Sequence, residues 1–200
     1  MEVVLDKKYP VSAGLDAGWV VLSNMHELAT CMPGAQITEE IDATHYKGSV
    51  RVKVGPAVAA FAGTIEVLTL DPATCTLKMM GKGADKSGSS ASMELTAKLV
   101  AAENGNSTLE GHAEVIVNGK FAQFGGRMMT SVSDMILKQF AEIFSQKAQA
   151  LQGAAASAEG TGAAAAAVFS APIVAKEFNA LAFIWALIRK FFADLFVRKS

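Results

Sequence analysis

The side chains that most often carry catalysis are sparse in this chain of 200 residues. His112 alternates with Glu110 and Glu114, which predicts a solvent-facing position, and His45 is also expected to be solvated. His26 falls in a short helical pattern, where a role at a pocket mouth stays open. No serine or cysteine is spaced with a histidine and an acid as an activated nucleophile requires. The sequence therefore favours a protein that is not an enzyme.

Metal and phosphate sites are equally hard to find. Cys31 and Cys75 have no metal-like spacing and are expected to be reduced thiols in a cytoplasmic protein. Histidine, cysteine and acidic residues do not cluster elsewhere, so we predict no metal site. Gly81-Lys82-Gly83 lacks the Walker pattern that surrounds a phosphate-binding loop and is interpreted as a strand-end turn.

The chain does concentrate adaptable apolar side chains. Methionines and glycines share the faces that are expected to point inward, where a close-packed core usually takes Leu, Ile and Val. Methionine adapts to irregular shapes and glycine leaves space, so the combination favours an apolar ligand pocket. A Met-rich core that is completely filled is the alternative. The candidate ligand-binding residues are Tyr46, Val54, Phe61, Ile65, Met79, Met93, Phe121, Phe124, Gly125, Met128, Val132 and Met135.

The C-terminal segment has the pattern of an amphipathic helix. Its longest uncharged run, Phe178 to Ile188, is shorter than the roughly 20 residues that span a bilayer. Basic residues flank an aromatic face, as in helices that lie in the membrane interface, while the rest of the chain is acidic. Docking of this helix on a protein stays open. The predicted membrane-binding residues are Phe178, Leu181, Ile184, Trp185, Ile188, Phe191, Phe192, Leu195 and Phe196.

Alternating patterns predict the elements that must position these side chains. A short strand covers Val3 to Tyr9, and two small helices follow before Pro33-Gly34. Strands with one apolar and one polar face then run from Ala35 to Lys120 as an antiparallel meander. A long helical pattern begins near Phe121 and is the element available to cover the apolar face of the sheet. This order describes an α+β helix-grip fold.

The chain divides into three parts. Residues 1–152 form the predicted ligand-binding domain. Residues 153–171 are rich in Ala and Gly and nearly devoid of large side chains, so we predict a flexible linker. Residues 172–200 form the amphipathic helix.

Three motifs resemble one known family in sequence and in order. They are Cys31-Met32-Pro33-Gly34-Ala35, then Val52-Lys53-Val54-Gly55-Pro56 with Phe61-Ala62-Gly63, and Asn118-Gly119-Lys120-Phe121-Ala122-Gln123-Phe124-Gly125-Gly126-Arg127. The family is CoxG, which is named for carbon monoxide dehydrogenase and belongs to the START-like SRPBCC superfamily. Phe121, where that family often has Leu, and an additional Gly126 depart from its pattern without changing the expected fold.

The resemblance implies an accessory protein of an aerobic molybdenum CO dehydrogenase or a related hydroxylase, on the inner face of the cell membrane. Combined with the pocket and the tail, it suggests a carrier of a respiratory quinone, menaquinone or ubiquinone, with no covalent cofactor. The formal net charge of −1 gives no indication of a nucleic-acid partner. The alternatives are a membrane-recruitment or maturation factor, a carrier of another lipid, and a cyclase-like enzyme.

Overall fold

The computed structural model describes residues 1–54 and 57–159. Alternation of apolar and polar side chains produces seven strands, joined into one antiparallel sheet in the order β1-β7-β6-β5-β4-β3-β2. Their bounds are β1 Glu2–Val11, β2 Ala35–Glu40, β3 His45–Val54, β4 Ala57–Asp71, β5 Thr76–Asp85, β6 Ser90–Ala101 and β7 Ser107–Asn118. The first strand therefore pairs with the last, and the remaining strands form a meander.

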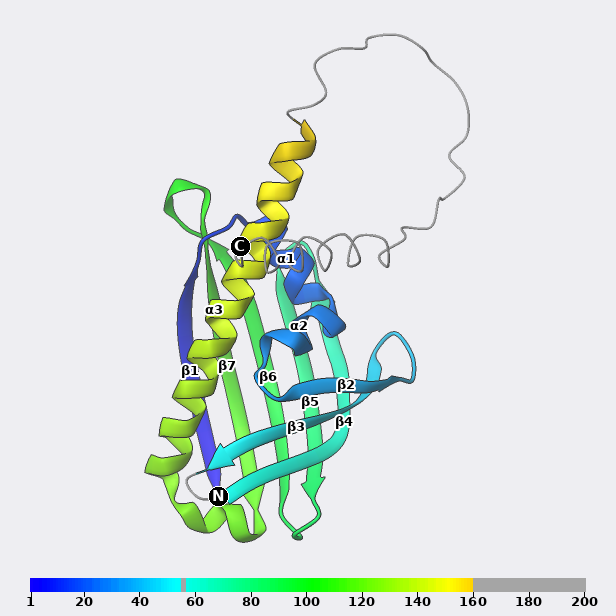
Figure 1. The fold of residues 1–200 in the computed structure, drawn as a ribbon, viewed down its shortest axis with the longest axis vertical. Coiled ribbons are helices and arrows are strands. Elements are labelled where there is room, and N and C mark those ends of the chain that lie inside the picture. Colours follow the sequence, from blue (N-terminus) through cyan, green and yellow to red (C-terminus); the bar gives the residue numbers. More distant parts are fainter. Residues whose placement is uncertain (55–56, 160–200) are drawn as a thin grey trace, which may run out of the picture. The chain divides into compact units, whose positions relative to one another are not determined.

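Three α-helices cover one face of this sheet. Their bounds are α1 Leu15–Ser23, α2 Met25–Cys31 and α3 Gly126–Glu159. Asn24 separates the two small helices and caps α2, because its side-chain oxygen accepts hydrogen bonds from the backbone N–H groups of His26 and Glu27. The long helix α3 crosses the sheet beside β1 and β7, and α1 and α2 pack beside its C-terminal half (Figure 1).

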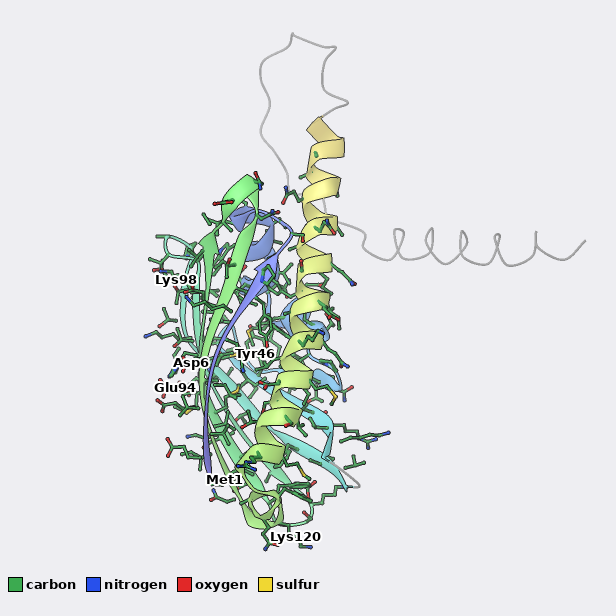
Figure 2. All side chains as sticks on the ribbon, turned by 90° about the vertical axis from the view of Figure 1, so that its left-hand side faces the viewer. Met1, Asp6, Tyr46, Glu94, Lys98 and Lys120 are labelled. Carbon is green, nitrogen blue, oxygen red and sulfur yellow. The ribbon has the colours of Figure 1, made fainter. Side chains whose placement is uncertain are left out.

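The two faces of the sheet differ in polarity, as the alternation predicts. Asp6, Glu94 and Lys98 point away from α3 on the outer face (Figure 2). Like its neighbours on that face, Lys8 forms a surface ion pair: its Nζ lies 2.6 Å from a carboxylate oxygen of Glu110. The outer face therefore remains solvated, and the apolar groups gather under the helices.

The interior contains two separate apolar clusters. The first surrounds Phe144 of α3, which is fully buried against Leu22, Leu77 and Val11. The second is smaller and is built on Val117 with aromatic and aliphatic neighbours near the start of α3. Because the clusters occupy opposite ends of the strands, the middle of each strand faces a space that the core does not fill.

The predicted α+β helix-grip fold is confirmed, with changes at both ends of the last helix. The 3₁₀ turn η2, Gly119–Phe124, precedes α3, so the α-helix begins at Gly126 instead of Phe121. Residues 153–159, which were predicted to be linker, continue α3 as helix, because alanine extends an existing helix at little cost. The remainder of the predicted linker and all of the tail lie outside the described residues.

Candidate ligand-binding cavity

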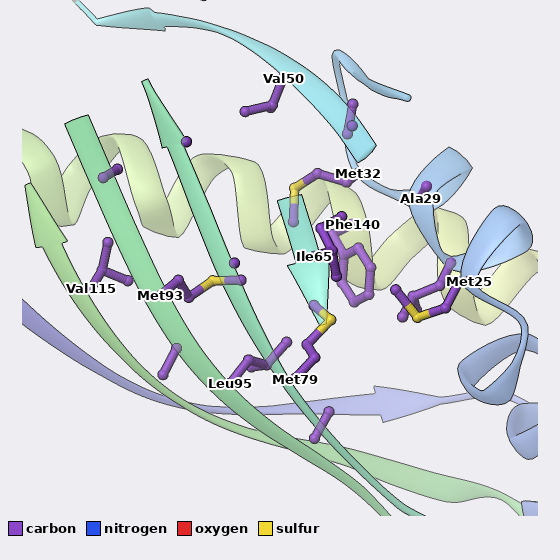
Figure 3. Close-up of a pocket in the computed structure, with 18 of the residues that line it drawn as sticks. Met25, Ala29, Met32, Val50, Ile65, Met79, Met93, Leu95, Val115 and Phe140 are labelled. Atoms are coloured by element: carbon purple, nitrogen blue, oxygen red, sulfur yellow. The ribbon is translucent and has the colours of Figure 1, made fainter. Parts of the chain in front are cut away.

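A cavity of about 420 Å³ lies between the sheet and α3, with α2 at one end (Figure 3). Its wall contains side chains from the first cluster, such as Leu22 and Leu77, and from the second, such as Phe61. The lining is almost entirely apolar. Such a space can enclose a lipophilic molecule by desolvation and shape, without directional bonds along most of its length.

The register of the strands explains why the middle of the sheet is hollow. On β7, Leu109 belongs to the first cluster and Val117 to the second, and the inward positions between them are Gly111, Ala113 and Val115. The same order recurs on β4, β5 and β6, whose middle positions hold Gly63, Met79, Gly81, Met93 and Leu95. Small or flexible residues thus occupy one level of the sheet, and that level is the cavity.

The glycines of this level are of two kinds. A Cβ at Gly63 would lie 1.9 Å from the carbonyl oxygen of Lys82, so this glycine allows β4 and β5 to approach closely. A Cβ at Gly111 would meet nothing within 4 Å, and at Gly81 it would meet only the tip of Met93 at 3.8 Å. Gly81 and Gly111 therefore leave cavity space. Gly81 lies inside β5, which corrects the interpretation of Gly81-Lys82-Gly83 as a strand-end turn.

Four methionines make much of the wall adaptable. Met79 and Met93 project from neighbouring strands, and Met25 and Met32 approach from α2 and the turn after it (Figure 3). Unbranched thioether side chains can move aside or close round a ligand at low cost. Sequence patterns predicted the strand pair, but the helical spacing of Met25 with Leu28 could have identified the α2 side as well.

The structure brings together only part of the predicted lining. Phe61, Ile65, Met79 and Met93 line the cavity. Tyr46 does not, because its ring is buried in the first cluster and its hydroxyl donates a hydrogen bond to the Ala43 carbonyl at 3.0 Å. The Val54 side chain lies outside the described part of the protein.

Three further candidates belong to the second cluster rather than to the cavity wall. Phe121 packs between Phe61 and Phe124, with ring centroids 5.7 and 5.8 Å apart. Val132 of α3 packs against the same group. These residues close the end of the cavity where the 3₁₀ turn leads into α3.

Met128 and Met135 were predicted to face inward, and this prediction is wrong. Their side chains are 38 and 52% exposed, and neither lines the cavity. The cause is Gly125, whose φ of +76° breaks the backbone between η2 and α3. A helical phase that is counted from Phe121 therefore does not continue past Gly125, which is itself exposed. The α3 residues at the cavity are Leu137 and Phe140.

Two polar side chains enter the lining from β1. The alternation of this strand places Lys7 and Tyr9 in the same inward row as Leu5 and Val11. The Lys7 ammonium lies 2.8 Å from a carboxylate oxygen of Asp134 on α3, and this hydrogen bond raises the pKa of Lys7. Burial raises the pKa of Tyr9. The sequence patterns did not single out these residues.

The histidines form exposed ion pairs instead of a catalytic group. The nearest acidic partners are Glu40 for His26, Asp42 for His45 and Asp6 for His112, with N···O distances of 2.9, 2.9 and 2.7 Å. Hydrogen bonds to Asp42 and Asp6 raise the pKa values of His45 and His112, respectively. His26 packs edge-on against the Tyr46 ring and does not line the cavity.

The described residues contain no group of three His, Cys, Asp or Glu side chains placed to hold a metal ion. None of the helices within residues 1–54 and 57–159 is long and apolar enough to cross a membrane. Cys31 is buried and Cys75 is partly exposed, and both thiols are free.

Comparison with known proteins relates this chain to one family and one fold. Residues 8–149 match the carbon monoxide dehydrogenase family CoxG. No curated protein sequence matches the chain significantly.

Solved structures share the fold at low sequence identity. A conserved protein from Geobacillus kaustophilus has a TM-score of 0.67 and 18% identity, over 74% of this chain and 95% of the other. The Zhui aromatase/cyclase from Streptomyces sp. R1128 has a TM-score of 0.55 and 13% identity, over 74 and 94%. A START superfamily protein from Mycobacterium smegmatis has a TM-score of 0.54 and 15% identity, over 74 and 98%. At these identities the similarity establishes a START-like fold and no particular activity.

Proposed function

Because the chain belongs to the CoxG family of carbon monoxide dehydrogenase accessory proteins, we propose that it carries a respiratory quinone for an aerobic molybdenum CO dehydrogenase or a related hydroxylase. The protein takes menaquinone or ubiquinone from the membrane, encloses it in the cavity and presents it to the enzyme for reduction. In this scheme the protein has no catalytic role of its own.

The cavity is the observation that carries this proposal. Its volume of about 420 Å³ lies within the roughly 300–1,000 Å³ typical of small-molecule sites. An isoprenoid chain offers only apolar surface, which suits a wall of aliphatic and methionine side chains. A protein that served only to recruit the dehydrogenase to a membrane would have no use for such a space.

The proposed division of labour requires no redox group on this chain. Electrons come from the cofactors of the dehydrogenase, and the carrier contributes binding and orientation. The open positions at Gly81 and Gly111 leave the space, and the methionines adjust around the ligand. Binding energy then derives mainly from the apolar area that the ligand and the wall remove from water.

Membrane association rests on the sequence pattern of residues 172–200. We propose that this segment lies in the bilayer interface with Trp185 and Phe192 on its buried face. It thereby keeps the domain close to the quinone pool. A tail that binds the dehydrogenase without preference for lipid would instead favour docking on protein.

Filling the cavity tests the proposal. Gly111→Leu places a side chain into open space on the inner face of β7, so the variant should fold while phylloquinone binding falls by about tenfold or more. Thr96→Leu, on the outer face of β6, is the matched control and should bind as the unchanged protein does. Quenching of tryptophan fluorescence in the full chain measures the affinity.

Each result of that titration is decisive. If the unchanged protein does not bind phylloquinone, the quinone-carrier proposal is wrong. Equal binding by Gly111→Leu and the unchanged protein would place the quinone somewhere other than this cavity. Strong competition by an unrelated phospholipid would favour a carrier of another lipid.

A further inference from the structure

Two polar side chains in an otherwise apolar wall call for an explanation. Lys7 and Tyr9 project from β1 into the cavity lining, and the strand alternation turns both inward. The other polar residues of the strand lining occupy alternate positions that turn their side chains to the outer face: Gln36, Ser49, Thr64, Lys82 and Ser92. A lysine in an inward row is costly unless it has a partner. Apolar residues would serve the fold alone at lower cost.

The position of Lys7 relative to the open space is specific. In the β1–β7 register it lies directly opposite Gly111, where a Cβ would meet nothing within 4 Å. Tyr9 lies opposite Leu109, one inward step further along the same strand. Lys7 and Tyr9 therefore border the part of the cavity where side-chain volume is missing.

Asp134 acts as the positioning residue for Lys7. Its carboxylate on α3 holds the Lys7 ammonium at 2.8 Å across the seam between β1 and α3. The ammonium has three protons, and this contact engages one of them, so others remain for an acceptor in the cavity. Among the described residues, the Tyr9 hydroxyl has no hydrogen-bond partner, so its proton is also available.

We propose that Lys7 and Tyr9 form a head-group subsite, which binds a carbonyl oxygen of the lipid that the cavity encloses. This inference rests on the proposed function and adds the end of the ligand that is recognised. A ring carbonyl accepts hydrogen bonds from the ammonium and the hydroxyl, while the hydrocarbon chain extends along the methionine wall. A lipid without an acceptor atom gains nothing from the subsite, so the site selects a carbonyl-bearing isoprenoid over the bare hydrocarbon.

The test compares two ligands that differ in the head group. Phylloquinone carries ring carbonyls and an isoprenoid chain, and phytane is the saturated hydrocarbon of that chain. Displacement of uncharged N-phenylnaphthylamine from the full-length protein reports both affinities. Lys7→Met should weaken phylloquinone binding about tenfold, as expected for a lost hydrogen bond to a charged group, and leave phytane within about twofold.

Lys8→Met is the matched control. Lys8 is the next residue of β1, its side chain is 72% exposed, and it pairs with Glu110 on the outer face. This variant should bind both ligands as the unchanged protein does. Tyr9→Phe removes only the hydroxyl and should weaken phylloquinone alone, by about threefold to tenfold. It decides the question if Lys7→Met does not melt cooperatively.

The outcomes separate this inference from the proposed function. Equal losses for phylloquinone and phytane would mean that Lys7 only shapes the cavity, and unchanged binding of both in Lys7→Met and Tyr9→Phe would exclude the subsite. In either case the carrier proposal survives. If the unchanged protein binds neither ligand, the carrier proposal fails and the subsite fails with it.

Discussion

At the scale of single residues, the environment of each polar group decides its chemistry. Histidines that face solvent pair with acids, and Lys7, which faces inward, pairs with Asp134. The two cysteines differ in the same way. Cys31 lies in the first apolar cluster with no exposed surface, and burial raises its pKa to about 11. Cys75 is partly exposed in the turn between β4 and β5.

We predict that maleimide labels Cys75 much faster than Cys31 at pH 8. The thiolate is the reactive form, and a pKa of about 11 leaves little of it on Cys31, which the reagent also cannot reach. Peptide mapping after a short exposure measures the two rates. The Cys75→Ser variant should then remain almost unlabelled until denaturant is added. Rapid labelling of folded Cys75→Ser would show that the region around α2 opens readily.

The elements show how far sequence patterns reach. Strict alternation predicted the strands and the sheet, because a strand buried on one face repeats every two residues whatever its neighbours are. The long helix was predicted, but its phase was not. Residues 119–124 form a 3₁₀ turn and Gly125 adopts a positive φ, so periodicity counted from Phe121 placed Met128 and Met135 inward. Backbone breaks of this kind depend on tertiary contacts.

The corrected phase of α3 makes a direct prediction about stability. Phe144→Ala should lower the free energy of unfolding by about 3–5 kcal/mol, because the ring is fully buried in the first cluster. Met135→Ala should change it by less than about 0.5 kcal/mol, because this side chain is 52% exposed on the outer side of the helix. Urea denaturation followed by circular dichroism compares them. A larger loss for Met135→Ala would restore the original phase.

At the scale of the whole molecule, the cavity results from how the elements combine. A Met- and Gly-rich inner face suggested either a pocket or a filled core, and local patterns could not distinguish them. The decision depends on the two clusters at opposite ends of the strands and on open positions such as Gly111. The inward lysine of β1 went unnoticed because a strand of one apolar face is expected to tolerate few charges. Its alternation with Leu5 and Val11 was the available signal.

The central claim, that this chain withdraws quinone from a membrane and encloses it, can be tested directly by extraction. Vesicles of anionic phospholipid that contain phylloquinone are incubated with the full-length protein and removed by sedimentation, and quinone in the supernatant is then measured. We predict that quinone leaves the vesicles with the protein, up to one molecule per chain. Gly111→Leu should extract little, and a chain ending at residue 171 should extract slowly although it binds free quinone. A supernatant without quinone, from a protein that remains folded, would contradict the claim.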